Sequence, residues 1–229
     1  MRLLCTLIVA AVGLSVTHAN AAERWVEGKN YFLVQPAQRT SVGPGKVEVA
    51  EAFSYGCPAC NQFVPVMAEL KKRLPPQAQI VYVHASFNTA ESWPLFQRSY
   101  YTALQLGITD KTHEAMFRSI WGHNAELAVV ENGRIKKPAP TIEDVARVYA
   151  RVAGVDANKV VAMSKSFVVD SNMRRADAWM KACQVDQTPT LVINGKYRLH
   201  VPSAGGVDQL YELVDFLVRR EIALTSASR

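Results

Sequence analysis

A pair of cysteines stands where a strand pattern gives way to a helical one, and this junction constrains the fold more than any other part of the sequence. The stretch from Val47 to Ser54 carries a short apolar, β-branched pattern that is typical of a strand. After Cys57-Pro58-Ala59-Cys60, apolar residues recur at helical spacing: Phe63, Met67, Leu70 and Leu74. Pro58 suits the first helical position, because the N–H that it lacks would have no partner there. The sequence therefore predicts a strand followed at once by a helix whose first turn holds both cysteines.

The position of Cys57 at a helix N-terminus indicates a reactive thiol. The thiolate is the reacting species, and the unpaired backbone N–H groups and the dipole of a helix start favour it. Cys60 lies one turn further on, close enough to resolve a mixed disulfide formed on Cys57. Two other interpretations stay open: a static disulfide, and half of a zinc site, although no second cysteine pair or suitably spaced histidines complete one.

The first residues have the order of a secretory signal peptide. Arg2 precedes an apolar run over residues 3–16, and Ala19-Asn20-Ala21 offers small residues to signal peptidase. The run is shorter than the roughly 18 residues that span a bilayer. We expect residues 1–21 to be removed, Cys5 with them, and the rest to work in an oxidising compartment without membrane insertion. A retained membrane anchor is the alternative.

Charge and motif content exclude several function classes. The chain has 26 Lys and Arg against 20 Asp and Glu, a net charge of +6, and its basic residues are scattered rather than clustered. We therefore expect no nucleic-acid partner. His113-Glu114 begins like a zinc-protease helix, but Phe117 stands where the second histidine is needed, so no metal site is expected there.

The remaining patterns predict strands near both ends of the chain and helices between them. Further strands are expected at 25–34, 80–87, 190–194 and 196–200, the last two joined at Asn194-Gly195. Helical spacing dominates from Ser92 to Cys183, where Thr141 and Asp144 predict a capping box, and again in a closing helix around Leu213. We expect an α/β core made of residues 22–89 and 184–229, with a helical domain at 90–183 inserted into it.

Three stretches carry a family resemblance: Glu51 to Cys60, Ser166 to Val169, and Thr188-Pro189 with the following Val192 to Tyr197. Together they resemble the thioredoxin-fold oxidoreductases, and among these the DsbA type of exported dithiol oxidase, over nearly the whole mature chain. The resemblance implies a thioredoxin fold, in which helices flank a central mixed sheet, with the helical domain inserted.

The resemblance also implies roles for residues outside the cysteine pair. Pro189 is implied to have a cis peptide bond and to lie beside the cysteines, leaving backbone groups free to pair with an extended substrate. Thr188 is implied to tune substrate contact and release. For a Thr-Pro taken alone, a trans proline at a strand start would be the ordinary interpretation.

Glu51 lies in an otherwise apolar stretch before Cys57, so its carboxyl is expected near the core. Burial would raise its pKa and let it relay protons to or from Cys60, the role that the resemblance implies for an acidic residue here. A solvated glutamate on an edge strand is the alternative. His84 matches a family histidine beneath the active site, and a satisfied core histidine is an equally good interpretation.

Three departures from the family pattern bear on oxidising strength. Ala59 stands where well-known members have a histidine that helps to stabilise the thiolate, which predicts a weaker oxidant. Thr188 replaces the valine common in the oxidase branch, and threonine there is found in the isomerase and reductase branches. Tyr82 takes the place of a basic partner for the acidic residue.

The function implied is that of a periplasmic thiol:disulfide oxidoreductase, which donates the Cys57–Cys60 disulfide to cysteines of reduced exported polypeptides. A DsbB-type membrane partner would reoxidise it, and we expect a monomer without a prosthetic group. Cys183 is expected to be a buried, inert residue, with regulatory pairing as the alternative. The open alternatives for function are a reductase or isomerase using the same dithiol, a non-catalytic peptide-binding module, and a metal carrier.

Overall fold

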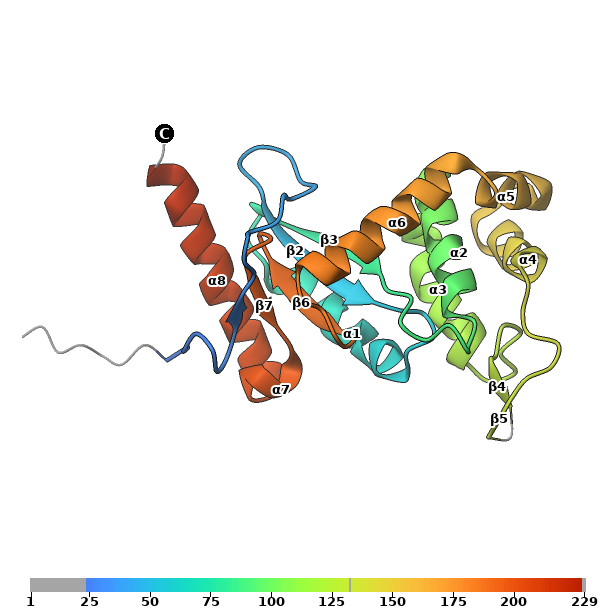
Figure 1. The fold of residues 1–229 in the computed structure, drawn as a ribbon, viewed down its shortest axis with the longest axis horizontal. Coiled ribbons are helices and arrows are strands. Elements are labelled where there is room, and N and C mark those ends of the chain that lie inside the picture. Colours follow the sequence, from blue (N-terminus) through green and yellow to red (C-terminus); the bar gives the residue numbers. More distant parts are fainter. Residues whose placement is uncertain (1–23, 132, 228–229) are drawn as a thin grey trace, which may run out of the picture.

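The computed structural model describes residues 24–131 and 133–227, so the expected signal peptide lies outside the described residues (Figure 1). Strands lie toward both ends of this part of the chain, and helices dominate its middle. In chain order the elements are β1 (Phe32–Leu33), β2 (Val47–Phe53), α1 (Pro58–Arg73), β3 (Ala78–His84), α2 (Trp93–Gln105), α3 (Thr109–Trp121), β4 (Val130–Glu131), β5 (Arg134–Ile135), α4 (Ile142–Ala153), α5 (Ala157–Ser164), α6 (Phe167–Ala182), β6 (Thr190–Ile193), β7 (Tyr197–Leu199), α7 (Val201–Ala204) and α8 (Val207–Ala227).

One mixed sheet forms the centre of the fold, with strand order β1-β7-β6-β2-β3. β2 pairs in parallel with β3, from Val47 opposite Ala78 to Phe53 opposite His84, and in antiparallel with β6. β2 is therefore an interior strand, and all of its residues are buried. The predicted mixed sheet is confirmed.

Helices cover both faces of this sheet (Figure 1). On one face, α1 and α8 enclose an apolar cluster that includes Val49, Phe63, Leu70, Leu191 and Leu213. On the other face, Met180 and Cys183 at the end of α6 pack against Ala50 and Ala52. Because strand residues alternate between faces, β2 carries Glu51 toward α1. Cys183 is fully buried, as expected.

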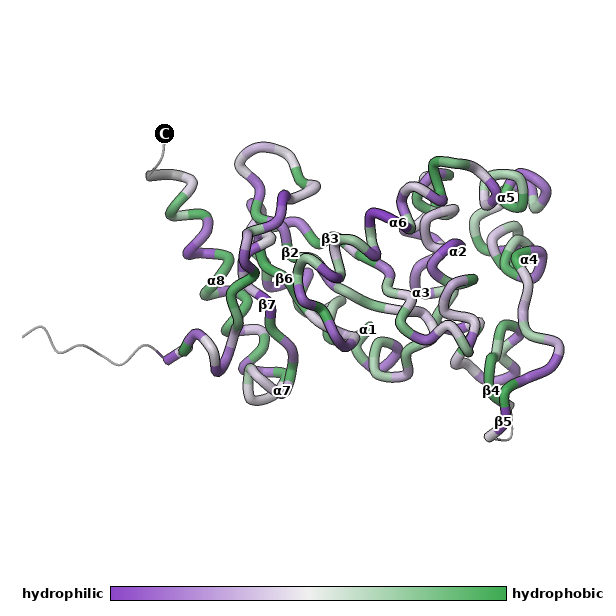
Figure 2. Tube along the Cα trace, viewed as in Figure 1, coloured by the Kyte–Doolittle hydropathy of each residue, from purple (hydrophilic) through white to green (hydrophobic). Residues whose placement is uncertain are grey.

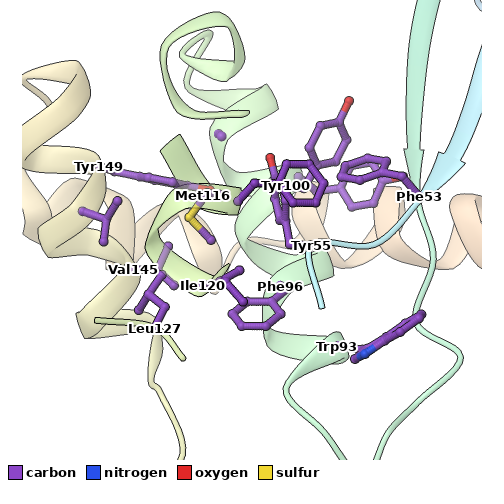
Figure 3. Packing of buried hydrophobic residues seen from close by; sticks show 14 of the residues in the cluster. Phe53, Tyr55, Trp93, Phe96, Tyr100, Met116, Ile120, Leu127, Val145 and Tyr149 are labelled. Atoms are coloured by element: carbon purple, nitrogen blue, oxygen red, sulfur yellow. The ribbon is translucent and has the colours of Figure 1, made fainter. Parts of the chain in front are cut away.

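The helices between β3 and β6 share a core with the end of β2. Figure 3 shows Phe53 and Tyr55 in one cluster with residues of the helical insert: Phe96, Tyr100, Met116, Ile120, Val145 and Tyr149. At the start of α4 the Thr141 hydroxyl accepts the Asp144 N–H, and the Asp144 carboxylate accepts the Thr141 N–H at 2.7 Å. The predicted capping box is confirmed. Hydrophobic and hydrophilic residues alternate along α4 and α8 (Figure 2), as expected for helices with one buried face.

Three predictions about the elements are wrong in their detail. The strand expected at 25–34 shrinks to β1, because the chain turns where the Gly28 N–H donates to the Tyr31 carbonyl at 2.8 Å. The strand expected at 80–87 spans Ala78–His84, since it follows the register of β2. The block expected to be helical also contains the hairpin β4–β5, with Gly133 at a φ of 74°.

The hairpin expected at Asn194-Gly195 joins β6 and β7, and its turn is closely packed. Asn194 and Gly195 have φ values of 51° and 65°, the left-handed conformation that a tight two-residue turn requires. A Cβ on Gly195 would lie 2.1 Å from the backbone oxygen of Gln38. Glycine is therefore required here for space as well as for conformation.

We expect Gly195→Ala to lower the free energy of unfolding more than Gly154→Ala. Gly154 has a φ of 71° with nothing within 4 Å of an added Cβ, so this control carries only the left-handed strain, about 1–2 kcal/mol. Gly195→Ala adds a backbone clash and should lose about 2–5 kcal/mol in all. Urea unfolding of both variants measures the difference. Equal losses would show that the Gln38 segment moves aside freely.

Candidate active site

Cys57 and Cys60 lie at the start of α1, just after the carboxyl end of β2. Cys57 is the N-cap residue and Pro58 the first residue of the helix, as predicted. The turn that places them is closed by the Cys57 N–H, which donates to the Ser54 carbonyl at 3.1 Å. Both sulfurs are free thiols here. Cys57 is 6% exposed and Cys60 1%, so Cys57 is the sulfur that another molecule can reach.

A cis proline faces the cysteine pair. The Thr188–Pro189 peptide bond is cis, and the Thr188 carbonyl oxygen lies 3.4 Å from Cys57 Sγ. Both residues immediately precede β6, which pairs with β2. The sheet therefore brings together two segments that are 131 residues apart in the chain.

The surroundings of Cys57 stabilise its thiolate. The largest cause is a hydrogen bond from the Cys60 thiol; the Thr188 side chain and the backbone N–H groups of Cys60 and Ala59 add to it. Against the opposing effect of burial, they lower the pKa of Cys57 to about 6. The two backbone donors are among those left unpaired at a helix start. At neutral pH Cys57 is therefore mainly a thiolate.

Cys60 has the opposite character. Burial is the largest cause that raises its pKa far above that of an ordinary thiol, followed by the hydrogen bond to Cys57 and the charges of Cys57 and Glu51. Cys60 is therefore a protonated donor in the dithiol form. Its proton has to leave before its sulfur can attack a mixed disulfide, because the thiolate is the nucleophile.

Glu51 lies on the interior strand β2 and is only 4% exposed, so the alternative of a solvated edge-strand glutamate is wrong. Burial, and secondarily the charge of Cys57, raise the pKa of its carboxyl well above the ordinary value. The residue borders a cavity of about 360 Å³ that Lys71, Tyr82 and His113 also line. A cavity of this size that is lined in part by polar side chains has room for several water molecules, which makes a proton path from Glu51 to solvent physically available.

The loop between β2 and α1 is fixed from other elements. Tyr55 donates its N–H to His84 Nε2 at 3.1 Å, and its carbonyl accepts from Trp121 Nε1 at 2.8 Å. Gly56 lies against Trp93, since a Cβ there would be 2.6 Å from Nε1 of the indole. Burial lowers the pKa of His84 to about 3. His84 is thus a neutral, hydrogen-bonded core histidine that shapes the loop.

Sequence reasoning missed Trp93, Trp121 and His113 as contributors to this region. All three come from α2 and α3 of the helical insert, and no local motif links them to the cysteines. The one local signal is Gly56, because a missing side chain directly before Cys57 is compatible with close approach by another group.

An apolar groove of about 420 Å³ lies beside the cis proline. Its walls come from α1, from the segment before β6 and from the region of α7, and its lining includes Ala59, Phe63, Val66, Gln187, Thr188, Pro189, His200 and Val201. A groove of this size and composition can take a few side chains of another polypeptide.

Two negative findings apply to residues 24–131 and 133–227. No three His, Cys, Asp or Glu side chains there lie together as metal ligands would. None of the helices in that part combines the length and the apolar composition needed to cross a membrane.

The fold and the site together define a class. A mixed sheet flanked by helices, with an inserted helical block, presents a dithiol at a helix start opposite a cis proline. These are the features of a thioredoxin-fold thiol:disulfide oxidoreductase, as the resemblance implied.

Comparisons with known proteins identify the family within this class. No protein-family model matches the chain. "Thiol:disulfide interchange protein DsbA" of Pseudomonas aeruginosa is 31% identical over 97% of this chain and 98% of the relative, and its namesake of Azotobacter vinelandii is 33% identical over 85% and 83%. The crystal structure of Pseudomonas aeruginosa DsbA superposes with a TM-score of 0.74 at 32% identity, covering 91% of this chain and 99% of that one. DsbA of Xylella fastidiosa gives a TM-score of 0.75 at 27% identity, covering 86% and 98%. The chain belongs to the DsbA family.

We expect Cys60→Ala to raise the pKa of Cys57, because it removes the largest cause of the lowering. A hydrogen bond to a charged group contributes about 1.5–3 kcal/mol, so alkylation of Cys57 near pH 6 should slow by about tenfold or more. The rate of iodoacetamide reaction against pH measures this. An unchanged profile would mean that the backbone N–H groups hold the anion unaided.

Proposed function

We propose that this chain is a periplasmic oxidase that donates its Cys57–Cys60 disulfide to cysteines of reduced exported polypeptides. The observation that carries the proposal is the place of Cys57 at the start of α1, beside Cys60, where its thiolate is stabilised. A disulfide whose reduced form is stabilised is a strong oxidant, because the low-pKa sulfur is a good leaving group from the mixed disulfide and a stable product. Membership of the DsbA family supports the same activity, and the expected signal peptide supports the compartment.

The first step opens the disulfide. A substrate thiolate attacks Cys57 Sγ, a bond forms between these two sulfurs, and the Cys57–Cys60 bond breaks with its electron pair on Cys60. The raised pKa of Cys60 means that this sulfur takes up a proton as it leaves. We assign the donor as Glu51, whose carboxyl burial keeps protonated at higher pH than usual.

The second step releases the oxidised substrate. Another substrate thiolate attacks the substrate sulfur of the mixed disulfide, forming the substrate disulfide and freeing Cys57 as a thiolate. Two electrons have then passed from two substrate thiols to the cysteine pair. The release is favourable because the departing Cys57 sulfur has a lowered pKa.

Substrate contact falls to the cis-proline segment and the groove beside it. The Thr188 carbonyl lies 3.4 Å from the reacting sulfur, so a chain bound to Cys57 passes next to Thr188 and Pro189. Backbone pairing with this segment is tolerant of sequence, and the apolar groove adds contacts with side chains. Such recognition suits unfolded polypeptides of many sequences.

The cycle requires an external oxidant, since each turn leaves the two cysteines reduced. We propose a membrane partner of the DsbB type for this step, and a monomeric enzyme that uses no prosthetic group. Cys183 takes no part, because it is fully buried among residues of α6 and the sheet, and burial raises its pKa to about 12.

The oxidase assignment is tested with a reduced peptide that contains two cysteines. We expect the disulfide form to oxidise it stoichiometrically, Cys57→Ser to lose this activity, and the matched control Cys183→Ala to keep it. Equilibration with glutathione buffers should give a reduction potential well above that of glutathione. A potential near that of thioredoxin would contradict the oxidase direction and favour the reductase alternative. Peptide binding that persists in Cys57→Ser with all cellular function intact would favour a binding module.

The lowered pKa of Cys57 also predicts how stability depends on pH. A group whose pKa falls on folding stabilises the folded state above its unfolded value and loses that contribution as pH falls through the folded value. The dithiol form should therefore gain stability as pH rises from about 6 to about 9. Unfolding is measured in a Glu51→Gln background, which removes the buried carboxyl from the titration, with Cys57→Ala in the same background as control. Parallel curves of the free energy of unfolding against pH for the two proteins would contradict a Cys57 thiolate in the folded state.

A further inference from the structure

His113 reaches from the helical insert into the cavity beside Glu51. It lies on α3, and its ring stacks on Tyr82 with centroids 4.3 Å apart and planes inclined by 34°. Tyr82 is in turn the residue opposite Glu51 in the β2–β3 register. Glu51, Tyr82 and His113 border the same cavity of about 360 Å³. The insert thus contributes a nitrogen heterocycle to the surroundings of the buried carboxyl.

The contact between His113 and Tyr55 is the basis for assigning the proton to one nitrogen of the His113 ring. Nδ1 lies 3.2 Å from the Tyr55 hydroxyl. Burial raises the pKa of Tyr55 well above the ordinary value, so that hydroxyl stays protonated, and we assign it as the donor to Nδ1. Burial lowers the pKa of His113 to about 4, so the ring is neutral at physiological pH. A neutral imidazole that accepts at Nδ1 carries its proton on Nε2.

The assigned Nε2–H group has no hydrogen-bond partner among the residues that the structure describes. Among the residues that the structure describes, only Tyr55 forms a hydrogen bond with His113, and it uses the other nitrogen. His113 borders the cavity beside Glu51, which offers this N–H group a place to donate. With the proton assigned to Nε2, a donor therefore adjoins the cavity that Glu51 also borders.

We infer that His113 is a positioning residue for proton transfer at Glu51, whose Nε2–H donates, through cavity water, to the carboxylate that forms there. This inference rests on the proposed relay role of Glu51. When Cys60 takes the proton of Glu51, a buried carboxylate remains, and such a charge is unfavourable without a hydrogen-bond donor. The donor stabilises the carboxylate until a proton from solvent restores it.

Other ionisable groups also lie around Glu51, and the donors among them compete with His113 for this role. From the elements packed around it these are Cys57, Cys60, Lys71 and Lys72 at α1, Tyr82 on β3, Tyr100 on α2 and Glu114 on α3. Lys71 is exposed, so its ammonium can stay in bulk solvent. His113 is a cavity-lining donor whose ring is held in place by the hydrogen bond with Tyr55.

A purely structural role is the competing explanation, because the His113 ring also packs edge-on against Phe53 and Phe117. Three variants separate the two. His113→Gln keeps an amide N–H near the place of Nε2, His113→Asn keeps one only near the place of Nδ1, and His113→Phe keeps ring packing without either nitrogen. His123→Gln, at an exposed histidine after α3, is the matched control.

The first readout is an infrared titration of the Glu51 carboxyl band in the disulfide form, in which neither cysteine ionises. The band is assigned by its loss in Glu51→Gln. We expect it to persist to higher pH in His113→Phe and His113→Asn, because loss of a donor disfavours the carboxylate, and to match the wild type in His113→Gln and His123→Gln. A uniform shift in all three His113 variants, or none in any, would overturn the inference. The inference would also be overturned if Lys71→Gln produced the expected shift in the Glu51 titration and His113→Phe did not.

The second readout is the rate at which a reduced two-cysteine peptide opens the disulfide. We expect about a tenfold loss in His113→Phe and His113→Asn, and no further loss when either is added to Glu51→Gln. Equal losses with and without the Glu51 carboxyl would show a structural role. A wild-type protein that oxidises no peptide would contradict the proposed function instead. The infrared titration would still test the effect of His113 on the Glu51 carboxyl.

Discussion

The stabilisation of a thiolate at the start of α1 is the interaction on which the rest of the site depends. It needs the unpaired N–H groups of a helix N-terminus and a second thiol one turn further on. Both conditions follow from the β2–α1 junction, where Cys57 caps the helix and Pro58 begins it. A helix that began one residue later would present its free N–H groups to a different side chain. The chemistry is therefore set by where a strand ends and a helix starts.

The helical insert is part of this site rather than an appendage to it. Trp121 donates to the Tyr55 carbonyl, Trp93 packs against Gly56, and the cluster that contains Phe53 continues into the insert. A shift of α2 or α3 would thus displace the loop that leads to Cys57. Because that loop places the helix start, the insert helps to determine how well the thiolate is stabilised.

The parts of the fold that the sequence predicts correctly are those that neighbouring residues determine. The cysteine pair, the capping box at Thr141 and the turn at Asn194 each depend on a few consecutive positions. Asn132-Gly133 carries the same turn signal, yet the surrounding helical pattern hides the hairpin β4–β5.

The predictions that are wrong or missing concern apolar residues or rings whose contacts lie far away in the sequence. Trp25 and Tyr31 look like strand residues, but they are buried by packing against the cluster beneath the sheet rather than by strand pairing over that range. Trp121 lies 66 residues from the carbonyl that it binds. Side chains at such separations meet only through the tertiary fold, and no local pattern records the encounter.

The departures from the family pattern change how the anion is stabilised, and they do not all act in the same direction. Ala59 brings no side-chain donor, although its backbone N–H still contributes, whereas the Thr188 side chain lowers the pKa of Cys57, which a valine could not do. The stabilisation of the thiolate that is missing at Ala59 is thus partly offset by Thr188. Tyr82, being neutral, brings no cation to Glu51, which leaves burial to keep that carboxyl protonated and ready for Cys60. Neutral donors carry no charge that titrates near neutral pH, so the pH response of the site is set mainly by the lowered pKa of Cys57 and the raised pKa of Glu51.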